Sequence, residues 1–114
     1  MLNKRYRFHS RGGVRYTYQH GKSIRRTNIT LVHAVNSRGR QRFAVVVSKK
    51  VAKSAIERNR IRRRVYEAIR IVKKEQNFNA EKDNIFVIYA KNIKTMPFED
   101  LKSLISGLLE ESMI

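Results

Sequence analysis

Residues 43–64 read FAVVVSKKVAKSAIERNRIRRR: a run of β-prone apolar residues, a short basic spacer and the start of an arginine-rich helix. Beyond residue 54, apolar side chains recur at spacings of three and four, at Ile61, Val65, Ala68, Ile69 and Val72. This period places them on one side of a helix. The stretch therefore predicts a buried strand followed by a long amphipathic helix over residues 54–76.

The other side of this helix is rich in cations. A helical wheel places the following residues there: Asn59, Arg62, Arg63, Tyr66, Arg70 and Lys73, with Arg60 and Arg64 beside the apolar stripe. Like charges four residues apart destabilise an isolated helix, and an ordinary solvated face mixes the two signs. Since a guanidinium can bind two phosphate oxygens and stack on bases, the pattern favours an RNA partner over a merely solvated surface.

The charge of the whole chain supports a polyanionic partner. The 114 residues include 26 Lys and Arg against 9 Asp and Glu, a net charge of +17. No acid precedes Glu57, and residues 75–114 carry more acids than bases. The N-terminal two thirds of the chain is thus expected to meet the anion.

Working outward, the remaining patterns predict a single α+β domain over residues 1–114, with helices packed on one sheet. The expected order is a helix at about residues 10–20 closed by Gly21, strands at 24–36 and 42–49 joined as a hairpin through a turn at 37–40, the long helix, a strand at 84–90 and a last helix from Pro97. Residues 1–9 look like an extended basic arm, whose order in the free protein the sequence leaves open.

Several classes of protein are disfavoured. The chain has no cysteine, hence no disulfide and no Cys-type zinc site, and no apolar run approaches the ~20 residues of a membrane span. No export signal is recognised, so we expect a soluble, cytoplasmic protein without a membrane partner. The histidines lack metal-ligand spacing, and Glu57 and Glu67 are the only acids before residue 75. We therefore expect no catalytic residue and no metal site on the protein itself.

One motif is more specific than the charge. The segment Ser-Lys-Lys-Val at 48–51, then a spacer, then Arg-Asn-Arg-Ile-Arg-Arg at 58–63, resembles the signature of the bacterial ribonuclease P protein family. The basic start, the short aromatic-bearing helix, the later strand and the last helix are similar too. The resemblance implies a mainly antiparallel sheet, with a left-handed crossover from strand 42–49 through the long helix to a parallel strand, a ribosomal protein S5 domain 2-like fold.

The resemblance also implies a function. Members of the family pair with a large catalytic RNA, and the complex removes the 5′ leader of precursor tRNA. The RNA holds the catalytic Mg²⁺ and carries out the hydrolysis, so the protein is a non-catalytic subunit with two RNA partners and no small-molecule substrate. Its expected contacts with the catalytic RNA are Lys49, Lys50, Lys53, Arg58, Asn59, Arg60, Arg62, Arg63 and Arg70.

The leader is expected to lie between the first helix and the sheet. The matching positions are Arg11, Val14, Arg15, Tyr18 and Val32. Val14 stands where the family usually has phenylalanine, and Val32 where an aromatic residue is common. Valine cannot stack on a base, and stacking is worth roughly 1–3 kcal/mol, so leader binding is expected to be weaker unless Tyr16, Phe8 or Tyr6 substitutes. A core tyrosine with a wet hydroxyl is the alternative for Tyr18.

Three other functions stay open at this point. A ribosomal-type rRNA-binding protein without a processing role would have the same composition. A DNA-binding architectural protein would bind duplex DNA as well as single-stranded RNA. A membrane-surface protein would need a Trp-, Phe- or Leu-rich helix face, which the basic helix lacks. The oligomeric state and the preferred leader nucleotides cannot be predicted from the sequence.

Overall fold

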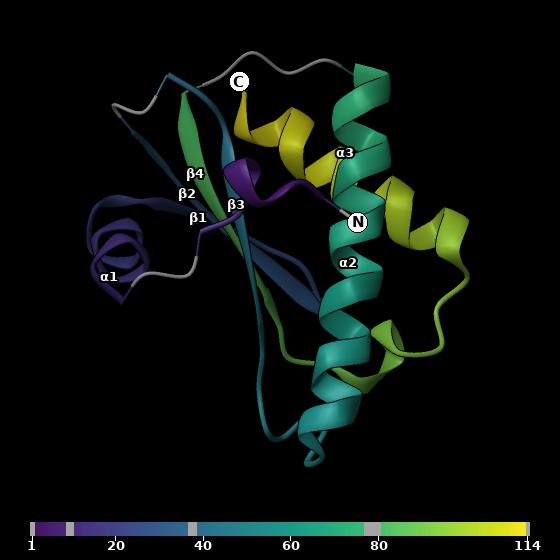
Figure 1. The fold of residues 1–114 in the computed structure, drawn as a ribbon. Coiled ribbons are helices and arrows are strands. Elements are labelled where there is room, and N and C mark those ends of the chain that lie inside the picture. The colour runs from purple at the N-terminus through teal and green to yellow at the C-terminus, as the bar shows by residue number, and fades with distance from the viewer. Residues whose placement is uncertain (1, 9–10, 37–38, 77–80, 114) are drawn as a thin grey trace.

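The computed structural model of the protein shows four strands in one mixed sheet (Figure 1). It describes residues 2–8, 11–36, 39–76 and 81–113. The order across the sheet is β1 (Lys22–Arg25), β2 (Ile29–Val35), β4 (Lys82–Ile88) and β3 (Arg42–Val47). Because β2 is antiparallel to β1 and β4, and β3 is parallel to β4, the sheet is mainly antiparallel, as predicted.

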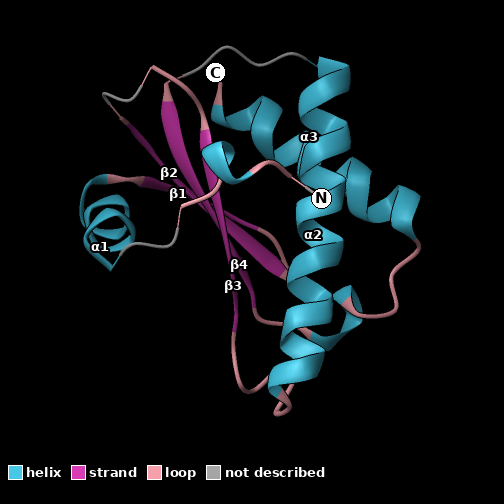
Figure 2. Ribbon diagram, in the orientation of Figure 1, coloured by secondary structure: helices cyan, strands magenta, loops and turns pink. Residues whose placement is uncertain are grey.

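Helices cover both faces of the sheet, which confirms the α+β sandwich (Figure 2). The long helix α2 (Ala55–Gln76) and the last helix α3 (Phe98–Ser112) lie on one face, and α1 (Arg11–His20) lies on the other. Two short 3-10 helices, η1 (Lys4–Tyr6) and η2 (Lys91–Ile93), precede α1 and α3.

The main core lies between the sheet and the pair α2 and α3. All five residues of the predicted apolar stripe of α2 are at most 2% exposed. They pack with Phe43 and Phe86 from the sheet and Leu101 and Ile105 from α3. Fully burying such a side chain contributes about 1.5–3 kcal/mol. At the start of α2, the Ser54 hydroxyl accepts hydrogen bonds from the backbone of Ile56 and Glu57, so the helix begins where the sequence predicts.

The prediction that strands 24–36 and 42–49 form a hairpin is wrong. Strand β4 lies between β2 and β3 and pairs with both. The reason is the composition of β4: Ile85, Phe86 and Ile88 are fully buried and point to both faces of the sheet. A strand that is apolar on both sides belongs in the sheet interior.

The predicted strand at 24–36 is two strands. Residues 22–25 and 29–35 form an antiparallel hairpin, β1 and β2, in which Lys22 lies opposite His33. The backbone NH of Arg26 donates to the carbonyl of Ile29 (2.9 Å), and the carbonyl of Asn28 accepts from Tyr89 (3.3 Å). These bonds close the turn that the alternating sequence does not reveal.

The connection from β3 through α2 to β4 joins parallel strands, as the family resemblance implied. The left hand of this crossover and the likeness to the ribosomal protein fold stay predictions. Helix α3 begins at Phe98, with Pro97 as its N-cap, one residue after the predicted start. In the predicted turn, Gly39 has a positive φ of 71°, and residues 37 and 38 lie outside the described part.

Residues 2–8 are not simply extended. Lys4–Tyr6 forms η1, Leu2 and Phe8 are buried, and the backbone NH of Phe8 donates to the carbonyl of Phe43 (3.0 Å). Arg7 forms an isolated parallel bridge with Phe43, so this segment lies along the outer edge of β3.

Helix α1 approaches the sheet closely at its end. A Cβ atom on Gly21 would overlap with the carbonyl oxygen of Thr17 and would lie 2.7 Å from that of His33. Only glycine fits between α1 and β2 here, directly after the last residue of the helix.

Candidate nucleic-acid interface

Four of the predicted RNA-binding residues lie together on the first turns of α2. We call Asn59, Arg60, Arg62 and Arg63 the helix patch. They line a shallow hollow together with Ala55 and Ile56, and all but the half-buried Arg62 are exposed. No carboxylate is among the described residues that line this hollow, so the patch presents three positive charges to solvent.

The three predicted lysines stand beside the start of the same helix. The loop between β3 and α2 buries Val51 and Ala52, and its turn is held by backbone bonds from both residues to the carbonyl of Ser48. Burial of these two side chains leaves the other loop residues outside: Lys49, Lys50 and Lys53 are exposed. The loop lysines and the helix patch thus belong to one basic end of the molecule.

Arg58 is predicted to contact RNA, but its guanidinium has another partner in the structure. Its Nη1 donates to the carbonyl oxygens of Ala52 (3.0 Å) and Lys53 (2.7 Å). The side chain is half-buried and ties the lysine loop to the helix. Arg58 therefore positions the loop, whatever further contact it makes with RNA.

Arg64 and Arg70 are also engaged. Arg64 donates to the carbonyl oxygens of Ile93 (2.8 Å) and Met96, which fixes the segment before α3. Arg70 forms an ion pair with Glu67 (2.5 Å), and this hydrogen bond lowers the pKa of Glu67 to about 2. Arg70, one of the predicted contacts with the catalytic RNA, is thus paired with a carboxylate on its own helix.

The polar side of α2 is shorter than the helical wheel predicts. Tyr66 is only 9% exposed, and burial raises the pKa of its hydroxyl. The N-terminal segment covers this part of the helix: the guanidinium of Arg7 lies 5.6 Å from the Tyr66 ring centre, and Lys73 Nζ lies 3.9 Å from that of Tyr6. The prediction that Tyr66 faces solvent is therefore wrong, because a distant segment packs against it.

The predicted leader-binding residues are divided between an apolar cluster and the surface. Val14 packs against a cluster beneath α1 that contains Val32, Phe8, Ala44 and Ile85. Val32 is 6% exposed and Phe8 is 4% exposed, so neither can receive a base without movement. The predicted substitution by Phe8 is thus not available in this arrangement.

Two of the predicted leader-binding residues are exposed to solvent. Arg15 is exposed, and Tyr18 is 46% exposed, its partial burial raising the pKa of its hydroxyl. The side chain of Arg11 lies outside the described part. On the outer side of α1, Tyr16 is 52% exposed and stacks on His20 with ring centres 4.2 Å apart. The spacing of four residues on a helix was the sequence signal for this pair.

Neither the helix patch nor the α1 surface offers carboxylates for catalysis. In the basic part of the chain, Glu57 is paired with Lys94 (2.8 Å) and Glu67 with Arg70. Among the described residues, no group of three or more His, Asp or Glu lies close enough to hold a metal ion. No helix in the described part is long and apolar enough to cross a bilayer.

Comparison with known proteins agrees with these features. The profile of the family described as Ribonuclease P matches residues 2–112. The ribonuclease P protein component of Syntrophus aciditrophicus is 33% identical over 100 residues, covering 88% of this chain and 81% of that protein. That of a Synechococcus strain is 35% identical over 79 residues, which span 60% of this chain and 62% of the relative.

A solved structure shows the same fold. The ribonuclease P protein from Thermotoga maritima superposes with a TM-score of 0.78 at 20% sequence identity, covering 92% of this chain and 96% of that one. At this identity the likeness shows the fold alone. Together with the match of the family profile over nearly the whole chain, it supports one conclusion: the protein belongs to the bacterial ribonuclease P protein family.

Proposed function

We propose that the chain is the protein subunit of ribonuclease P, acting in the cytoplasm in the 5′ maturation of tRNA. It binds the catalytic RNA through the helix patch and the loop lysines, and it binds the 5′ leader of precursor tRNA across α1. The observation that carries the proposal is the exposure of Arg60 and Arg63 beside three exposed lysines, at a hollow whose described lining holds no carboxylate.

Phosphate neutralisation supplies the affinity in this proposal. The carbonyl bonds of Arg58 hold Lys53 and its neighbours near the first turn of α2, so the loop and the helix act as one rigid surface. Cations fixed in advance lose less conformational freedom when they meet a folded RNA. Each contact with a phosphate releases counterions, so binding should weaken steeply with salt.

Leader binding would use the exposed residues of α1. Tyr18 offers part of its ring, and Arg15 offers a charge to the phosphate backbone. Single-stranded RNA is commonly bound by aromatic stacking combined with cations. Since Val14 and Val32 belong to a closed apolar cluster, we assign them to supporting α1 rather than to stacking on bases.

The chemistry is assigned to the RNA partner. The described carboxylates near the basic surface are paired with cations, and a hard divalent ion such as Mg²⁺ prefers several oxygen ligands. The residues present therefore do not fit a magnesium site of the protein's own. In the proposal, Mg²⁺ is held mainly by the RNA, and the protein contributes binding and orientation.

Reconstitution tests the function. The protein is mixed with a bacterial ribonuclease P RNA and precursor tRNA at low Mg²⁺, and 5′ cleavage is measured. We expect the protein to restore cleavage and the double variant Arg60→Ala/Arg63→Ala to restore it less. The control variant Lys74→Ala/Lys91→Ala removes the same charge from exposed positions outside the patch.

The outcomes separate the alternatives. If the wild-type protein leaves cleavage unchanged but captures ribosomal RNA from a lysate, the ribosomal-type alternative replaces the proposal. If the patch and control variants lose activity equally, net charge rather than the patch carries binding. Equal affinity for duplex DNA and single-stranded RNA at matched salt would favour an architectural DNA-binding protein.

A further inference from the structure

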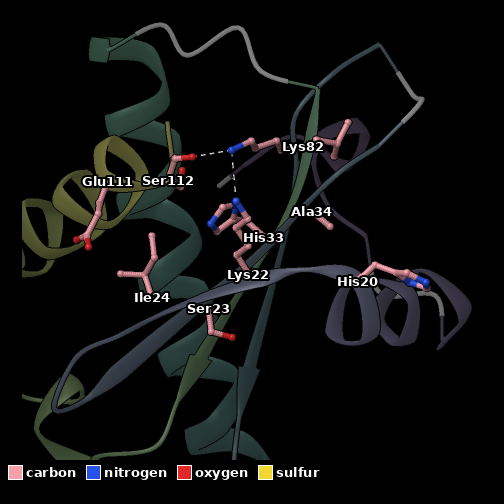
Figure 3. Close-up of a pocket in the computed structure, with 10 residues that line it drawn as sticks. His20, Lys22, Ser23, Ile24, His33, Ala34, Lys82, Glu111 and Ser112 are labelled. Carbon is pink, nitrogen blue, oxygen red and sulfur yellow. Dashed lines mark hydrogen bonds between the residues drawn. The ribbon is translucent and has the colours of Figure 1, made fainter. Parts of the chain in front are cut away.

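A second basic site lies at the other end of the fold, away from the helix patch. It is a hollow of ≈ 390 Å³ bounded by the start of β1, the end of β2, the start of β4 and the end of α3 (Figure 3). This volume is many times the ~30 Å³ that one water molecule occupies in the liquid. None of its lining residues belongs to the predicted contacts with either RNA.

The strand register brings three nitrogen-bearing side chains together there. Lys22 lies directly opposite His33 in the β1–β2 pair, so both point to the same face of the sheet. On β4, Lys82 lies opposite Val35, two residues from the partner of His33, and thus also faces that side. Figure 3 shows Lys22, His33 and Lys82 converging beneath the end of α3.

Among the described residues that line the hollow, one carboxylate accompanies these positive groups. The carboxylate of Glu111 lines the hollow but is paired with Arg26. Lys82 Nζ donates to the backbone carbonyl of Ser112 (2.6 Å), which positions the ammonium without neutralising it. Lys22 on β1 and Lys82 on β4 lie on the two sides of β2, and their charges repel each other. A bound anion would relieve that repulsion.

Burial strengthens the argument. His33 is 8% exposed, and its Nδ1 lies 3.5 Å from Lys82 Nζ. Burial and the charges of Lys82 and Lys22 lower the pKa of His33, and burial together with Lys22 lowers the pKa of Lys82. A neutral His33 that accepts at Nδ1 carries its proton on Nε2, where it can donate to an anion.

We propose that the hollow lined by Lys22, His33 and Lys82 binds a phosphate group, supplied by a backbone phosphodiester of the bound RNA. The proposal rests on the function proposed above for the source of the phosphate. The site holds the phosphate between two ammonium groups and an imidazole, on a sheet edge that the helix patch does not reach. It gives the protein a second anchoring point for RNA.

Inorganic phosphate is the probe for the site itself. Histidine ring resonances of the isolated protein are followed by NMR at pH 7 while phosphate is added. We expect a saturable shift of the His33 ring in the wild-type protein. In Lys22→Gln the apparent affinity should fall several-fold, whereas Lys74→Gln, the charge-matched control, should bind as the wild type does. Both lysines are exposed, so neither change should disturb folding, which a thermal melt checks.

The second arm asks whether RNA supplies the phosphate. Affinity for the catalytic RNA and for precursor tRNA is measured over a range of salt. For the RNA that occupies the hollow, Lys22→Gln should lower the slope of log affinity against log salt by about 0.7–0.9, the loss of one phosphate contact. Lys74→Gln should leave it unchanged.

Each outcome supports or overturns a stated part of the proposal. A His33 ring that does not respond to phosphate, or responds equally in wild type and Lys22→Gln, overturns the site. A response to phosphate with unchanged salt slopes for both RNAs shows a site for free phosphate and overturns the RNA assignment. Failure of the wild-type protein to restore 5′ cleavage would instead remove the proposed function, and the phosphate titration would still stand on its own.

Discussion

Arg63 and Arg64 are neighbours in the sequence, yet their guanidinium groups have different surroundings. Arg63 is exposed in the helix patch, whereas the half-buried Arg64 donates to the carbonyls of Ile93 and Met96. Replacing each by alanine should therefore separate RNA binding from stability. Because the two residues carry the same charge on the same turn, each variant is the matched control for the other.

The magnitudes follow from the contacts. Arg64→Ala removes the charged hydrogen bonds of a half-buried guanidinium, so we expect a loss of about 1.5–3 kcal/mol in the free energy of unfolding. Arg63→Ala removes no such bond and should stay within about 0.5 kcal/mol of the wild type. For the catalytic RNA, Arg63→Ala should lower the salt slope by about 0.7–0.9, and Arg64→Ala should leave it unchanged.

Urea unfolding measures the first quantity, and RNA binding at several salt concentrations measures the second. Binding is measured at a temperature at which both variants are folded. The reasoning is refuted if Arg63→Ala destabilises the protein as much as Arg64→Ala does. It is equally refuted if Arg64→Ala keeps its stability and loses a phosphate contact.

Three further predictions concern other contacts. Gly21→Ala should destabilise the protein by about 1–3 kcal/mol in urea unfolding, because its Cβ would overlap with backbone, whereas Gly107→Ala, with open space around it in α3, should stabilise it by up to about 1 kcal/mol. Asp83→Ala should cost about 3–5 kcal/mol in the same assay, since it leaves the guanidinium of Arg42, which it binds at 2.7 Å, buried and unpaired. Tyr18→Ala should weaken binding of precursor tRNA more than of mature tRNA, and an equal loss in both titrations would remove this residue from the leader site.

Local patterns predicted the helices well. The spacing from Ile61 to Val72 fixes one buried side of α2 regardless of what packs there, and Ser54 and Pro97 mark helix starts to within one residue. These patterns involve residues close together in sequence, so they predict the same helix in any fold that buries the apolar stripe.

Pairing of strands could not be predicted in the same way. The alternation from Ile24 to Asn36 is the same whether the chain runs straight or turns at residues 26–28, and only the bonds to Tyr89 and Ile29 decide. Likewise, β4 comes between β2 and β3 although it begins at Lys82, long after both strands have ended at Val35 and Val47. Both features depend on partners distant in sequence.

The candidate RNA-binding site, too, was predictable only where it depends on local sequence. Charge density identified the helix patch, and its four residues do lie together. The sequence could not tell Arg58 and Arg64 from Arg60 and Arg63, because the difference lies in carbonyl groups of two separate loops. The hollow around His33 was not anticipated, since it needs the β1–β2 register and the end of α3 together.

The position of the helix patch on α2 explains why so many arginines are tolerated there. Arg60 and Arg63 lie three residues apart on the helix, and like charges at such helical spacings cost about 0.2–0.5 kcal/mol per pair. The four buried Ile and Val side chains of the stripe contribute about 1.5–3 kcal/mol each, so the core easily offsets this repulsion. The fold can thus hold Arg60 and Arg63 in an unfavourable field that a polyanion relieves. It follows that removing both side chains should leave the protein at least as stable as before and weaken only its binding to RNA.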